Sequence, residues 1–256
     1  MTYDAVHSGE LDIGRLFQRT FGMIGRNVVT LAVLGVVFVG APDALLQFAS
    51  SGLRSYAGAS VQSVDWPLLL GAYLLYFCGI GLYNMASVRV AIDDAEGRRA
   101  SIPDGLATMF RFLLPGLAAG AVLMVGAFAT YLLFIIPGVI FLLTFFVVLP
   151  AIVAEKASVF GSFARSRELT RGRRGALFGA MFLLGIIVGI ANFVVAFLAA
   201  MIARSINPSP QALYAAAGLA TGLMSPIGAV FGAVVYQRLV ELKEGRSKAK
   251  VADVFA

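Results

Sequence analysis

The stretch FLLPGLAAGAVLMVGAFATYLLFIIPGVIFLLTFFVVLPAIVA, residues 112–154, is 43 residues long and contains no charged side chain. One helix of this length would measure about 65 Å, more than twice the roughly 30 Å hydrocarbon core of a bilayer. The stretch therefore predicts two membrane-spanning helices joined by a turn. We place the turn at Pro137 and Gly138, near the middle, because proline followed by glycine favours a turn.

Apolar runs of spanning length occur along the whole chain. Of its 256 residues, 59% are hydrophobic and 13% are charged, whereas a soluble domain has about 25% charged residues. Six spans are expected, at residues 27–48, 67–91, 112–133, 137–154, 176–203 and 212–237. The predicted fold is therefore all-α: a polytopic membrane protein whose six transmembrane helices form three hairpins.

We treat residues 1–256 as one integral membrane domain. Its parts are a cytoplasmic amphipathic N-terminal segment at residues 1–26, a six-span bundle at 27–237 and a basic cytoplasmic tail at 238–256. The segment before the first span is long and holds three acidic residues, unlike a secretory signal. We therefore expect the first span to be retained.

The basic residues gather on one side of this topology. If the N-terminus is inside, 18 of the 20 Lys and Arg residues lie in cytoplasmic segments, and only Arg54 and Arg204 lie outside. Short loops rich in Lys and Arg stay on the cytoplasmic side, so both termini are expected there. The net charge of +6 follows from this topology. Nucleic acid is not an expected partner, since it would call for a dedicated basic face with aromatic stacking residues.

An amphipathic segment precedes each predicted hairpin. In residues 11–25 the apolar face comprises Ile13, Leu16, Phe17, Phe21 and Ile24, and the polar face comprises Arg15, Gln18 and Arg19, with Arg26 following. In residues 101–113 the spacing of Leu106, Met109, Phe110 and Leu113 predicts a second such helix. Ser101, with Pro103 and Asp104 in the first turn, marks its start. The chain thus resembles three copies of one unit, an interfacial helix followed by a hairpin.

The third segment contains SFARSRELTRGRRG, residues 162–175. A helix at 156–171 would place Val159, Phe160 and Phe163 on one face, and Gly172 would end it in the left-handed conformation. We expect lipid contacts from its basic and aromatic side chains and from the first segment, namely Arg165, Arg171, Arg173, Arg174, Phe160, Phe163, Arg15 and Arg19. The lipids would be anionic. The positive-inside rule alone is an alternative explanation for these arginines.

Residues that carry catalysis or bind metals are scarce. His7 is the single histidine and Cys78 the single cysteine, which excludes histidine clusters and disulfides within the chain. No nucleophile elbow, P-loop or zinc-protease motif occurs. We therefore predict no catalytic, cofactor-binding or metal-binding residue and no cofactor.

Polar residues within the spans have structural explanations. Asn84 and Asn192 lie deepest, and each is expected to make an interhelical hydrogen bond. Asp43 lies about 16 residues into the first span, so we place it at the outer interface. G-x-x-x-G pairs occur at Gly116/Gly120, Gly175/Gly179, Gly185/Gly189, Gly218/Gly222 and Gly228/Gly232. They are expected to pack within the chain, and they also allow a homo-oligomer.

The run LPAIVAEKASVFGSFARSRELTRGRRG, residues 149–175, resembles the signature of a bacterial multi-pass family labelled glycerophosphoryl diester phosphodiesterase membrane domain, with its related stand-alone membrane proteins of unknown function. The matching positions are Pro150, Ala151, Glu155, Ala164, Arg165, Ser166, Leu169, Thr170 and Gly172. The resemblance implies a bacterial inner-membrane location. The resemblance also implies that, in members that are phosphodiesterases, a separate soluble barrel domain carries out the hydrolysis. We therefore expect no phosphodiesterase activity from these residues.

Three function classes remain. The preferred one is a non-enzymatic inner-membrane protein that acts as a scaffold or regulatory partner of other membrane or envelope proteins. A small transporter or channel is the second, and a polar path between the spans would favour it. The third is a lipid head-group enzyme or an accessory subunit of a glycerophosphodiester phosphodiesterase, which the resemblance alone suggests.

Overall fold

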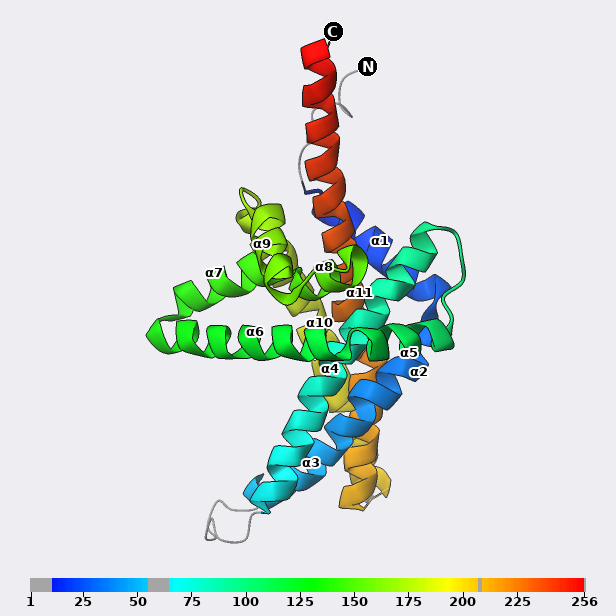
Figure 1. Cartoon of the computed structure of the whole chain (residues 1–256). Coiled ribbons are helices and arrows are strands. Elements are labelled where there is room, and N and C mark those ends of the chain that lie inside the picture. Colours follow the sequence, from blue (N-terminus) through cyan, green and yellow to red (C-terminus); the bar gives the residue numbers. More distant parts are fainter. Residues whose placement is uncertain (1–10, 55–64, 207–208, 256) are drawn as a thin grey trace.

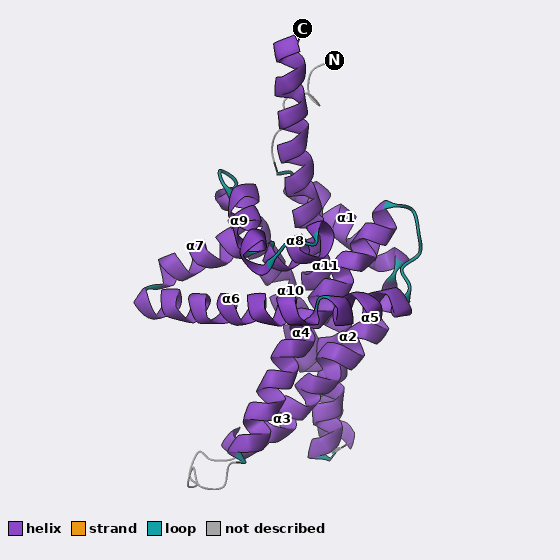
Figure 2. Ribbon diagram, viewed as in Figure 1, coloured by secondary structure: helices purple, strands orange, loops and turns teal. Residues whose placement is uncertain are grey.

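The computed structural model describes residues 11–54, 65–206 and 209–255, so His7 lies outside the described part. Within these ranges the regular structure is entirely helical, as Figure 2 shows. The elements are α1 Ile13–Arg26, α2 Val28–Gly35, the π-helical turn η1 Val36–Gly40, α3 Ala41–Arg54, α4 Trp66–Ala95, α5 Ile102–Arg111, α6 Leu113–Leu133, α7 Ile135–Phe145, α8 Val148–Glu155, α9 Val159–Thr170, α10 Arg174–Ile206 and α11 Pro210–Phe255.

Six helical segments are long and apolar enough to cross a membrane, as predicted. They are Val28–Ser51, Trp66–Ala95, Leu113–Leu133, Ile135–Glu155, Arg174–Val195 and Gln211–Gly245. The first of them is a composite of α2, η1 and α3. The fourth combines α7 and α8. Short helices α1, α5 and α9 lie where the three amphipathic segments are expected.

Local sequence determines where these helices begin and end. The side chains of Asp12, Asp65, Ser101 and Ser158 each accept a hydrogen bond from the backbone N–H three residues later, which satisfies one donor of the first turn. The predicted start of α5 at Ser101 is thus confirmed. Gly172 has a φ of +80°, as predicted, and it ends the α9 segment in the left-handed conformation.

The turn between the third and fourth spans is not at Pro137 and Gly138, where the sequence places it. Helix α6 ends at Leu133, the extended residue Phe134 makes the break, and α7 begins at Ile135. Pro137 fits in the first turn of α7 because the N–H groups of a first turn have no partner within the helix. Gly138 instead lets α7 approach the ring of Tyr131 on α6.

Helix α11 forms the centre of the molecule. It packs along α1, α4 and the whole first span, and Figure 1 shows it running through the length of the structure. Gly218 and Gly222 of α11 meet Gly35 and Gly40 of the first span so closely that a Cβ on any of the four would overlap the opposite backbone. This glycine seam confirms packing within the chain for the Gly218/Gly222 pair.

The other spans lie at the periphery. Helices α6 and α7 pack against each other and run across the direction of α11 in Figure 1. Helix α10 packs on α11 and α7, yet only 6% of its spanning segment is buried, against 56% of that of α11. Helices α1 and α9 lie at the same end of the molecule as the C-terminal half of α11 (Figure 1).

Candidate functional site

Arg165, the first of the predicted lipid-contacting residues, points toward carboxylates of its own chain. Its Nε lies 2.7 Å from Glu155 Oε1, and its other nitrogens lie 3.4 Å from Glu168 and 3.5 Å from Glu244. Tyr236 also donates a hydrogen bond to Glu155 at 2.7 Å. The Arg165 side chain is only 23% exposed. Its charge therefore joins α8, α9 and α11.

Lys243 of α11 extends this charge network. Its Nζ lies 2.8 Å from Glu168 Oε1 and donates to the Glu168 carbonyl oxygen at 3.0 Å. The hydrogen bond from Lys243, aided by Arg165, lowers the pKa of Glu168 below its ordinary value. Partial burial disfavours the charged form of Arg165, but the facing Glu155 and Glu168 carboxylates outweigh burial and raise its pKa. Both groups stay charged at neutral pH.

The two predicted aromatic residues of α9 have different surroundings. Phe160 is 81% exposed and lies at the surface. Phe163 is half-buried, and its ring meets Phe145 of α7 edge-on at 5.2 Å between centroids. Only Phe160 is therefore presented to the surroundings.

The arginines that follow α9 also differ from one another in exposure. Arg171 is exposed and has no hydrogen-bond or ion-pair partner among the described residues. Arg173 and Arg174 are half-buried, and the Nε of Arg174 is buried without a partner in the described chain. On α1, Arg15 pairs with Asp12 and Arg19 with Glu241, both at 3.1 Å.

Helix α9 packs through a polar face that the sequence analysis missed. Its buried residues are Ser162, Ser166, Leu169 and Thr170, and they follow helical spacing. The hydroxyls of Ser166 and Thr170 both donate to the carbonyl oxygen of Thr144 on α7, at 2.8 and 3.2 Å. Small hydroxyl residues repeat every four positions along this face, which leaves room for close helix contact. This repeat is the sequence pattern that could have predicted the packing face.

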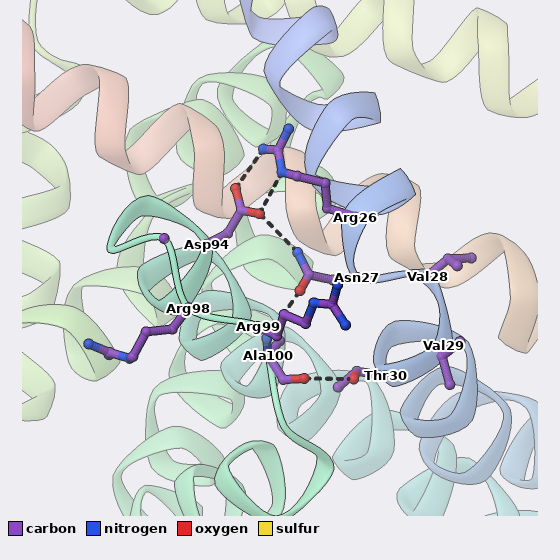
Figure 3. Close-up of a pocket in the computed structure, with 10 residues that line it drawn as sticks. Arg26, Asn27, Val28, Val29, Thr30, Asp94, Arg98, Arg99 and Ala100 are labelled. Atoms are coloured by element: carbon purple, nitrogen blue, oxygen red, sulfur yellow. Dashed lines mark hydrogen bonds and ion pairs between the residues drawn. The ribbon is translucent and has the colours of Figure 1, made fainter.

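A polar pocket of about 650 Å³ lies between the α1–α2 junction and the loop from α4 to α5 (Figure 3). Arg26 donates to both carboxylate oxygens of Asp94, at 2.8 and 2.7 Å. The buried Asn27 donates to Asp94 at 3.0 Å and accepts from the Ala100 N–H at 3.2 Å. The Ala100 carbonyl then accepts from Thr30 at 3.0 Å. These bonds hold the two walls of the pocket together.

A second cavity, of about 460 Å³, lies among the spans. Its walls come mainly from α4, α10 and α11, with Val39 of η1 and Phe146 beside α7. Most lining side chains are apolar. The polar ones are Tyr76, Tyr83, Asn84, Asn192, Thr221 and Ser225. We call this partly open cavity the span cavity.

Three polar side chains of the span cavity keep unused hydrogen-bonding groups. Asn84 and Asn192 each donate to a carbonyl of their own helix, at 2.8 and 2.9 Å, and their Oδ1 atoms accept nothing from a described residue. The hydroxyl of Tyr76 likewise makes no hydrogen bond within the described ranges. The interhelical bonds expected of the two asparagines are therefore not formed. Sequence reasoning identified both amides but could not tell that they line one cavity.

Asp43 contacts Thr221, one of the residues that line the span cavity. Its Oδ2 accepts from Thr221 of α11 at 3.0 Å and from Gln47 at 2.8 Å. This carboxylate therefore joins α3 to α11. The sequence predicts the depth of Asp43 but not its contact with a cavity-lining residue.

Comparison with known proteins gives no match to this chain among family models, curated proteins or solved structures. The resemblance of residues 149–175 to the phosphodiesterase membrane domain thus remains an expectation. Within the described ranges, no three His, Cys, Asp or Glu side chains gather in a way that could hold a metal ion. Among the described residues, the span cavity and the pocket of Figure 3 are candidate ligand-binding sites.

Proposed function

We propose that this chain is a non-enzymatic membrane protein that binds a neutral amphiphile in the span cavity. The observation that supports the proposal is the set of unused hydrogen-bonding groups on Tyr76, Asn84 and Asn192. The bilayer interior supplies no water to satisfy such groups, and each unsatisfied group there costs several kcal/mol. A bound ligand would remove that cost.

The dimensions and lining of the span cavity suit a small ligand. Binding sites typically have volumes of about 300–1,000 Å³, apolar walls and a few polar groups that fix orientation, and this cavity of about 460 Å³ has all three properties. One stripe of α10 faces it, namely Met181, Leu184, Gly185, Val188 and Asn192. Because α10 is so little buried, an apolar tail could extend past it into lipid.

The chemistry of the free groups indicates a neutral head group. Each asparagine amide retains one acceptor and one N–H, and the Tyr76 hydroxyl both donates and accepts. No charged side chain lines the span cavity among the described residues. A head group with hydroxyls, such as a glycerol, would match this mixture of donors and acceptors.

A matched pair of glycines on α10 allows a direct test. Gly185 lines the span cavity and Gly189, one turn further, does not, and a Cβ on either meets open space. Purified protein in nanodiscs is irradiated with a monoolein probe that carries a diazirine in its acyl chain, with and without excess monoolein. We expect saturable labelling of cavity residues such as Met181 and Met224, lost in Gly185→Leu and retained in Gly189→Leu.

The outcome that contradicts the proposal is labelling that follows surface exposure alone. Labelling would then spread over the exposed parts of all helices, excess monoolein would not reduce it, and both glycine variants would behave alike. Asn84→Leu with Asn192→Leu is a second arm: it removes the polar groups without filling the cavity. Saturable labelling should weaken there as well.

The proposal also covers location and orientation. We place the chain in a bacterial inner membrane with both termini cytoplasmic, and α1, α5 and α9 as amphipathic helices at the cytoplasmic surface, each ahead of a hairpin. The grouping of α1 and α9 at one end of the molecule supports this placement. Arg171 and Phe160, both exposed, are the predicted lipid-contacting residues best placed to reach lipid.

Absence of catalysis is part of the same proposal. Purified protein should hydrolyse glycerophosphocholine no faster than a detergent blank. Turnover above the blank that is lost on substitution of one acidic residue would show that the chain is an enzyme.

A scaffold for other membrane proteins is the second candidate, and the slight burial of α10 favours it. Photo-crosslinking tests this function in native membranes. A benzoylphenylalanine at Phe193, which is 71% exposed, should give discrete protein adducts, and one at the fully buried Phe231 should give none. Lipid adducts alone at position 193 would exclude a protein partner at this face.

A further inference from the structure

We infer that the pocket of Figure 3 binds the phosphate group of an anionic phospholipid. This inference does not depend on the span cavity, which is lined by different residues. Three arginines and one carboxylate line the pocket: Arg26, Arg98, Arg99 and Asp94. Its lining is therefore positively charged.

The three arginines differ in how far they are neutralised. Arg26 forms a bidentate pair with Asp94 but leaves its Nη1 unbonded. Arg98 pairs with Asp93 and Glu96, and in Figure 3 it points away from the other labelled residues. Arg99 has no partner among the described residues. Its guanidinium is directed toward the α2 side of the pocket (Figure 3).

Hydrogen bonds within the chain hold the walls of the pocket in place. Asn27 binds both Asp94 and Ala100, and Thr30 binds the Ala100 carbonyl, so the loop that carries Arg99 is fixed to the start of the first span. A cation held in place on a fixed loop loses little conformational freedom when an anion binds. Guanidinium groups also match phosphate geometry through paired N–H donors.

The apolar part of the wall identifies the source of the phosphate. Val28 and Val29 begin the first span, and they are 52% and 69% exposed. The pocket thus opens where charged loops meet an apolar helix, which is the level of lipid phosphates in a bilayer. A free phosphate ion would gain nothing from the two valines, whereas acyl chains would pack on them.

The test uses the full chain in detergent, titrated with phosphatidylglycerol and separately with phosphatidylcholine, with bound lipids counted by native mass spectrometry. Arg99→Gln is compared with Arg167→Gln on α9, an arginine outside the pocket that is also exposed and whose side chain has no partner among the described residues. A basic residue near an anionic surface contributes about 1 kcal/mol, so Arg99→Gln should weaken phosphatidylglycerol binding about fivefold. Arg167→Gln should weaken it by less than twofold.

Further arms separate the possible sources of phosphate. Inorganic phosphate at millimolar concentration should not displace phosphatidylglycerol, and Val28→Ser with Val29→Ser should weaken lipid binding. The inference is overturned if both arginine variants weaken phosphatidylglycerol binding equally, or if neither weakens it. It is also overturned if phosphatidylglycerol and phosphatidylcholine bind with equal affinity. Displacement by inorganic phosphate would assign the pocket to a soluble anion instead. Gly185→Leu should leave phosphatidylglycerol binding unchanged. The span-cavity proposal can therefore fail without affecting the result for this pocket, and the reverse also holds.

Discussion

Asn27 Nδ2 donates a hydrogen bond to Asp94 Oδ1 at 3.0 Å, although 67 residues separate them in the chain. The same amide donates to the Met23 carbonyl and accepts from the N–H of Ala100. One buried side chain therefore joins the end of α1, the end of α4 and the following loop. The first and second spans are fixed to each other at this end by polar contacts as well as by packing.

Asn27→Ala should lower the free energy of unfolding by about 1–3 kcal/mol, because it leaves buried hydrogen-bonding groups without partners. The measurement is chemical or thermal unfolding in a mild detergent. Gln18→Ala, on the exposed side of α1, is the control and should change stability little. Equal stability of the two variants would mean that the Asn27 bonds are not formed.

Gly79→Ala should destabilise the protein by about 1–3 kcal/mol, since overpacking a close contact forces the backbone to move. A Cβ at this position would overlap the carbonyl oxygen of Phe38 in η1. Gly71 lies two turns earlier in α4, and a Cβ there meets nothing within 4 Å. Gly71→Ala should therefore be neutral or stabilising by up to about 1 kcal/mol, as expected for alanine in a helix. A stable Gly79→Ala would contradict the observed helix contact.

The charge network on α9 predicts a pH dependence. Lys243 depresses the folded-state pKa of Glu168 below 4.5, so the stability that this carboxylate contributes is present above pH 4.5 and is lost as pH falls through the folded-state pKa. The difference in melting temperature between wild type and Glu168→Gln should be constant from pH 7 to 5 and shrink below pH 4.5. A difference that stays constant down to pH 3 would show that Glu168 is not paired.

Reporter fusions after residues 60, 100, 135, 172, 208 and 250 should alternate in location, beginning outside. The expectation rests on six segments of spanning length and on the bias of basic residues. Position 135 is the most informative, because α6 and α7 run across α11 in Figure 1. A cytoplasmic signal at position 135 would mean that α6 and α7 do not cross the membrane. An external signal at position 250 would contradict the cytoplasmic location predicted for the C-terminus.

Hydropathy and capping chemistry predicted the helices well. Each span was located by an apolar run, and Ser101 and Gly172 act as the end signals that their residue types favour. The connection between the third and fourth spans lies three residues before its predicted position. A proline in the first turn of a helix and a proline in a loop look the same in sequence.

Pairing between distant segments was not predictable in the same way. Arg165 was expected to face lipid, and it faces Glu155 and Glu244, one of them 79 residues away. Asn84 and Asn192 line one cavity from two helices, and neither local sequence indicates the other residue. Residue type and spacing describe one helix at a time, and the angle at which two helices meet depends on contacts that spacing does not encode.

The glycine seam between α11 and the first span has a consequence for synthesis. The first span emerges from the ribosome early, but the helix that fits against Gly35 and Gly40 is made only after the other five spans. Until then the early helices are without their main packing partner, and non-local contacts of this kind slow folding. A nascent chain that stalls before α11 would therefore lack the centre of its fold, and would be a substrate for membrane quality control.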